Sequence, residues 1–62
     1  MVGRTEISKL WDRWAFAAVE VHLAWNVWKA AAREMELTAF LAYRAALDRE
    51  ERAAAQLAAV YA

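Results

Sequence analysis

The chain has 62 residues, of which 63% are hydrophobic, and it contains no Cys, no Pro, one Gly and one His. The lack of Cys excludes disulfides and thiolate metal sites, and a single His excludes a multi-histidine metal site within one chain. Eight Lys and Arg residues balance eight Asp and Glu residues, so no net charge attracts the chain to nucleic acid or to an anionic membrane. Strong helix formers dominate and turn residues are almost absent, which predicts an all-α fold.

The short length of the chain limits its stability. A folded chain of about 60 residues buries only about 60% of the surface that its unfolded form exposes. Chains of this size are usually stabilised by disulfides, a bound metal or oligomerisation. Since disulfides are excluded, we expect a homo-oligomer and favour a dimer.

A first helix is predicted over about residues 5–34. Thr5 suits the N-cap position, and Glu6 follows in the first turn, where the helix dipole favours a carboxylate. Apolar residues then recur with the alternating three- and four-residue spacing of a heptad pattern. One row of this pattern consists of Ile7, Trp14, Val21, Trp28 and Met35.

The same helix carries large apolar residues outside that row. Phe16, Val19 and Leu23 lie among charged residues on the opposite side of the helix. The apolar arc is therefore wider than the seam of a two-stranded coiled coil, as expected of a helix that contacts two neighbours in a bundle.

The apolar pattern changes phase in the second half of the chain. Extending the first row would place Arg49 and Gln56 in the core. The new row lies five residues after the old one, which is about 140° around a helix. This new row consists of Phe40, Leu47, Ala54 and Tyr61.

A break near residues 34–38 lets both rows face one core. We therefore predict a helical hairpin, with a turn at about residues 35–37 and a second helix over about residues 38–61 that is capped by Thr38. The segment has no Gly or Pro, so the alternative is one long continuous helix in a coiled-coil-like assembly.

Two such hairpins are expected to pair into a homodimeric four-helix bundle, in which residues 1–62 of each chain form a single small domain. The residues predicted to make the interface are Ile7, Leu10, Trp11, Trp14, Val21, Trp25, Trp28, Met35, Phe40, Leu47, Leu57 and Tyr61.

Four tryptophans occur in a short repeat, W-x-x-W-x-x-A-A, at residues 11–18 and 25–32. A Trp-rich face suits either a pocket for a flat ligand or the core and subunit interface of a bundle. Alternation of Trp with Ala favours the bundle, because large side chains pack against small ones on a facing helix. A buried indole N–H needs an acceptor, for which Glu20, Asn26, Thr38 or a main-chain carbonyl are candidates.

No catalytic motif is visible. Ser8 is the only serine and has no histidine near it in the helix, and the single glycine excludes a glycine-rich phosphate loop. Glu20 and His22 point away from each other in one helix, so they form no acid–base pair within one chain. A haem or metal site would need His22 from each of two copies. We predict that the protein is not an enzyme and has no resident cofactor or metal.

These observations predict a small non-enzymatic interaction or assembly protein that self-associates through a Trp/Ala-rich face. One alternative is a small subunit or inhibitor that docks this face on a larger host protein. Another is ligand, haem or metal binding in a bundle core around His22.

The cellular location and the source of the protein are also predicted. Residues 14–32 are largely apolar, but Glu20 within them argues against a membrane-spanning helix. The first residues lack the character of a signal peptide, so we expect a cytoplasmic location. The abundance of Ala and Arg suggests a GC-rich bacterial or phage gene.

Overall fold

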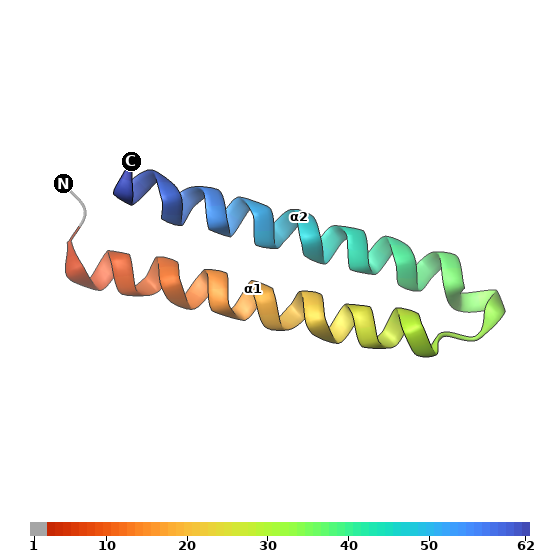
Figure 1. Cartoon of the computed structure of the whole chain (residues 1–62). Coiled ribbons are helices and arrows are strands. Elements are labelled where there is room, and N and C mark those ends of the chain that lie inside the picture. Colours follow the sequence, from red (N-terminus) through yellow and green to blue (C-terminus); the bar gives the residue numbers. More distant parts are fainter. Residues whose placement is uncertain (1–2) are drawn as a thin grey trace.

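The computed structural model describes residues 3–62 and shows two antiparallel helices joined at one end (Figure 1). Helix α1 spans Arg4–Ala30 and helix α2 spans Glu36–Tyr61, with a short 3₁₀ helix, η1, at Arg33–Met35 between them. These residues contain no strand. The predicted all-α hairpin is confirmed, and the alternative of one long continuous helix is wrong. The predicted domain also includes Met1 and Val2, which lie outside the described residues.

Helix α1 begins without a side-chain cap from Thr5. Its N-cap is Gly3, and Thr5 lies inside the first turn, so the predicted cap is wrong. The main-chain N–H of Gly3 donates a hydrogen bond to Glu6 Oε2 at 3.1 Å. This contact is the carboxylate half of a capping box. Glu6 therefore satisfies one donor at the helix start and places negative charge where the helix dipole favours it.

The turn comes earlier in the chain than predicted. Helix α1 ends at Ala30, four residues before the expected end, and α2 begins two residues before its expected start. Ala31 has φ −65° and ψ 137°, and Ala32 has φ −65° and ψ 154°. Both residues are extended, and none of residues 3–62 has a positive φ. Two extended alanines thus reverse the chain without a glycine.

Main-chain groups close this turn. The N–H of Ala31 donates to the carbonyl of Trp28 at 3.2 Å, and the N–H of Met35 donates to the carbonyl of Ala32 at 2.8 Å. Met35 is the N-cap of α2 and makes no side-chain cap, while Thr38 lies within the helix, so the predicted Thr38 cap is wrong. The 3₁₀ turn of η1 replaces the side-chain cap, because its main-chain bonds lead directly into α2.

The seam between the two helices is built largely from alanine. Among residues 3–62, only one buried residue is larger than alanine, and the most buried, Ala46, is 1% exposed. Small side chains let the two helix backbones approach closely, but they remove little apolar surface from water. The buried residues are Ala17, Ala39, Ala46, Ala53 and Leu57.

The hairpin is elongated and has a large surface for its mass. Its Cα radius of gyration is 14.4 Å, whereas a compact domain of this length has about 10.6 Å. Its accessible surface is 4956 Å², against about 4,100 Å² for a compact folded monomer of 7.1 kDa. The lone chain thus exposes roughly 900 Å² more than a compact protein of its size.

Candidate functional site

An aromatic cluster lies at the turn end of the hairpin, with Trp28 at its centre. The Trp28 ring centroid is 5.0 Å from that of Phe40, 5.4 Å from that of Tyr43 and 5.4 Å from that of Trp25. The Tyr43 ring stacks on Trp28 at 28°, and Trp25 meets Trp28 edge-on at 77°. Such pairs contribute about 0.5–1.5 kcal/mol each beyond the area that they bury. Trp28 therefore links α1 to α2 next to the turn.

A second cluster lies at the open end. Trp11 meets Trp14 edge-on with a centroid distance of 6.0 Å, and it also meets Tyr61 at 6.5 Å. The Trp11 indole N–H donates to the Tyr61 hydroxyl at 3.0 Å. Residues fifty positions apart in sequence are thus joined, and this contact ties the end of α2 to the start of α1.

Glu50 is a carboxylate within the seam. The Trp14 indole N–H donates to Glu50 Oε1 at 3.0 Å, in a partly buried contact. Glu50 lies seven residues after Tyr43 and seven before Leu57, in the row of α2 that faces α1. Two indole donors are therefore satisfied by Glu50 and by Tyr61. The predicted acceptors, Glu20, Asn26, Thr38 or a main-chain carbonyl, are therefore wrong for these two indoles. The signal for Glu50 in the sequence was an acid within an apolar heptad row.

Replacing Glu50 with alanine is expected to lower the free energy of unfolding by about 1–2 kcal/mol, because the Trp14 N–H loses its acceptor in a partly buried position. Urea denaturation followed by far-UV circular dichroism measures this change. Glu50→Gln keeps an acceptor oxygen, so it should recover most of the loss. Equal effects of the two substitutions would show that the Trp14 hydrogen bond is not what stabilises this position.

One broad side of the hairpin carries residues that recur every seven positions on both helices. We call it the aromatic side, and it is continuous because Trp11 lies against Tyr61 and Trp28 lies against Phe40. It remains open to solvent, since Trp11 is 47%, Trp25 39% and Tyr61 63% exposed. The aromatic side consists of Trp11, Ala18 and Trp25 of α1 and Phe40, Leu47, Ala54 and Tyr61 of α2.

The predicted interface residues divide into three groups in the structure. Met35 is 53% exposed and lines a cavity beside the turn, away from the aromatic side. The contact of every one of these residues with a second chain stays a prediction. One group faces the other helix of the same chain and consists of Ile7, Leu10, Trp14, Val21, Trp28 and Leu57. The group on the aromatic side consists of Trp11, Trp25, Phe40, Leu47 and Tyr61.

The residues considered for chemistry do not come together in one site. His22 and Asn26 are exposed on α1, and Glu20 forms an ion pair with Arg49 across the helices at 3.8 Å. Within residues 3–62, no group of three or more His, Cys, Asp or Glu side chains is placed to hold a metal ion. Neither α1 nor α2 is long and apolar enough to cross a membrane.

Comparison of the chain with protein-family models, with curated proteins and with solved structures finds no significant match.

Proposed function

We propose that the protein is a non-enzymatic assembly protein whose working form is a homodimer of hairpins, paired through the aromatic side into a four-helix bundle. The observation that carries this proposal is the small size of the buried core. In the part of the chain that the structure describes, Leu57 is the only buried residue larger than alanine, while Trp11 and Trp25 remain 47% and 39% exposed. A chain with so little internal burial gains most of its remaining apolar stabilisation from a second molecule.

The excess surface has the size that a dimer needs. The lone hairpin exposes roughly 900 Å² more than a compact monomer of its mass, and a standard specific interface buries about 800 Å² on each partner. Covering one side of the hairpin with an identical hairpin would bring the surface close to that of a compact protein.

The aromatic side is complementary to a copy of itself. On α1 the order along the helix is large, small, large, at Trp11, Ala18 and Trp25. On α2 the small residue Ala54 lies between the larger Leu47 and Tyr61. Two hairpins shifted by one such step place large side chains against small ones, which is how helical layers interdigitate. Association through this side is the proposed basis of any adaptor or assembly role.

The experiment that tests the dimer is sedimentation equilibrium of the wild-type chain and of Ala54→Glu. Ala54 lies in the middle of the aromatic side, so a carboxylate there would be buried without a partner in the dimer. Each of the two chains contributes one such charge, at a cost of about 3 kcal/mol, so the dissociation constant should rise by at least about 100-fold. Ala55→Glu is the matched control, because the neighbouring Ala55 is exposed on the outer face of α2.

Three results would count against the dimer through the aromatic side. The first is a wild-type chain that stays monomeric and well folded up to millimolar concentration. The second is an equal effect of Ala54→Glu and Ala55→Glu. The third is an isolated chain that aggregates or lacks fixed structure, which would favour docking of the aromatic side on a larger host protein instead.

A further inference from the structure

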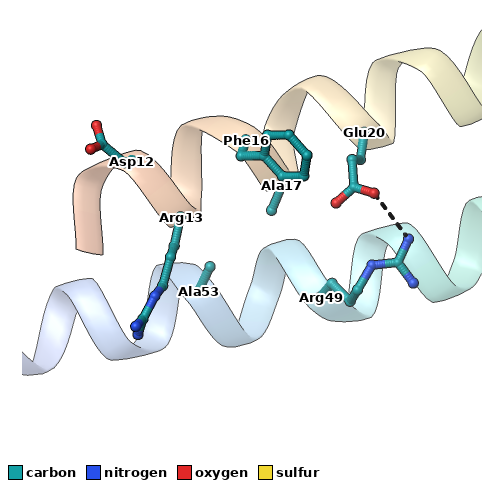
Figure 2. Close-up of a pocket in the computed structure, with 7 residues that line it drawn as sticks. All are labelled: Asp12, Arg13, Phe16, Ala17, Glu20, Arg49 and Ala53. Atoms are coloured by element: carbon teal, nitrogen blue, oxygen red, sulfur yellow. Dashed lines mark ion pairs between the residues drawn. The ribbon is translucent and has the colours of Figure 1, made fainter. Parts of the chain in front are cut away.

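The side of the hairpin opposite the aromatic side contains a cavity of about 460 Å³ between the two helices (Figure 2). We call it the Phe16 pocket. Ala17 and Ala53 lie at its base, where α1 and α2 face each other, and Phe16 stands beside them on α1. Its lining consists of Asp12, Arg13, Phe16, Ala17, Glu20, Arg49 and Ala53.

A dimer through the aromatic side would leave this pocket uncovered. Phe16 comes two residues before Ala18, so the two side chains point about 160° apart around α1. Phe16 is 68% exposed, and the row continues with Val19 at 56%, Leu23 at 58% and Val27 at 62%. Single exposed apolar residues are normal, but a contiguous row of large ones marks an interaction surface.

The charges around the pocket indicate which partner fits it. Arg13 and Arg49 contribute two positive charges and Asp12 and Glu20 two negative ones, so the rim is neutral as a whole. Arg49 and Glu20 already face each other at 3.8 Å, with side chains 51% and 38% exposed. A uniformly acidic or basic partner would leave two like charges opposed. A partner with the same alternation of charges, such as a second copy, would not.

The spacing of these residues along α1 is symmetric. Phe16 and Ala17 are adjacent, and Arg13 lies as far before the point between them as Glu20 lies after it. If two copies of α1 run antiparallel about a two-fold axis at that point, each Phe16 lies over Ala17 of the other copy. Each Arg13 then lies beside Glu20 of the other copy. A large ring meets a small side chain, and both charge pairs have opposite signs.

We propose that the Phe16 pocket is a second self-association site, at which two copies pair antiparallel through α1 about a two-fold axis between residues 16 and 17. This site is separate from the aromatic side. Two different symmetric contacts on opposite sides of one hairpin join dimers into larger species, so the protein assembles beyond the dimer.

The test combines one substitution on each side and measures mass by sedimentation velocity over a range of concentrations. Phe16→Glu blocks the pocket and Ala54→Glu blocks the aromatic side. The wild-type chain should form species larger than a dimer, each single variant should stop at a dimer, and the double variant should be monomeric. Because Phe16 is 68% exposed, its variants should keep the helicity of the wild type. Phe16→Ala is a second variant that adds no charge.

The oligomeric states of the wild type and the variants show which of the two contacts forms. A wild-type dimer that becomes monomeric with Ala54→Glu and is unaffected by Phe16→Glu and Phe16→Ala overturns the Phe16 contact and leaves the aromatic-side dimer intact. A wild-type dimer that is unaffected by Ala54→Glu and becomes monomeric with Phe16→Glu overturns the aromatic-side dimer and supports the Phe16 contact.

Charge reversal tests the two-fold geometry itself. Arg13→Glu alone places two acidic side chains opposite each other at both charge pairs of the two-fold contact, and Glu20→Arg alone does the same with basic side chains. Each substitution should therefore raise the dissociation constant of the Phe16 contact about tenfold. In an equimolar mixture each variant meets the opposite charge on the other, and association should return to near the wild-type level. Arg44→Glu, on the outer face of α2, is the control. A mixture that associates no better than either variant alone overturns the antiparallel pairing.

Discussion

Trp28→Ala is expected to lower the free energy of unfolding by about 3 kcal/mol, the low end of the range for large aromatic residues replaced by alanine. Trp28 touches the rings of Trp25, Phe40 and Tyr43, with centroid distances of 5.0–5.4 Å. A domain of this length has a total stability of roughly 3–9 kcal/mol. Loss of this one side chain therefore removes a large part of the stability and loosens the packing of α1 against α2 at the turn end.

Urea denaturation followed by far-UV circular dichroism measures the effect of Trp28→Ala. Wild type and variant must be compared at one protein concentration, because the proposed self-association would add to the apparent stability. Leu37→Ala is the matched control near the turn, since Leu37 is 68% exposed and should change the free energy of unfolding by less than about 0.5 kcal/mol. If the two variants were equally stable, the aromatic cluster would not be what holds the turn end together.

Ala46→Leu should destabilise the hairpin by about 1–3 kcal/mol, although leucine is more hydrophobic than alanine. Ala46 is 1% exposed at the middle of the seam, where the closeness of the helices leaves no room for a branched side chain. The added atoms force α1 and α2 apart and loosen the neighbouring contacts of Ala17 and Ala53. Thermal unfolding at fixed concentration reports the change.

Ala45→Leu is the control for the effect of leucine on helix propensity. Ala45 is exposed on the same turn of α2, so leucine there should leave stability almost unchanged. A stabilising effect of Ala46→Leu would show that the helices are held further apart in solution, with space between them that a larger side chain can fill.

The heptad rows made the helical hairpin predictable from the sequence. The change of phase between Met35 and Phe40 correctly indicated a break, because two rows about 140° apart on one straight helix cannot share a core. The exact position of the break was harder to predict from the sequence. Residues 30–32 are three alanines, which favour helix, and tertiary pairing of the helices overrides that preference at Ala31 and Ala32.

The contacts between side chains depended on long-range register, which the sequence alone does not fix. The acceptor of the Trp14 indole is Glu50 of the other helix, and finding it requires knowing which turn of α2 lies beside Trp14. The Phe16 pocket also depends on register, because Ala17 and Ala53 must lie opposite each other to form its base. The wide apolar arc of the first helix, with Phe16 in it, was the part of this surface visible beforehand.

The turn at Ala31 and Ala32 has a topological consequence. Since Ala31 and Ala32 both have φ −65°, which is already a helical value, straightening the turn at these two residues changes mainly ψ. An opened chain could lay its second half against the first half of another opened chain and recreate every contact of the seam. This domain-swapped exchange needs no new complementary surface. In such an exchange, the preference for the closed form would depend on how strongly residues 31–35 favour the turn over a straight helix.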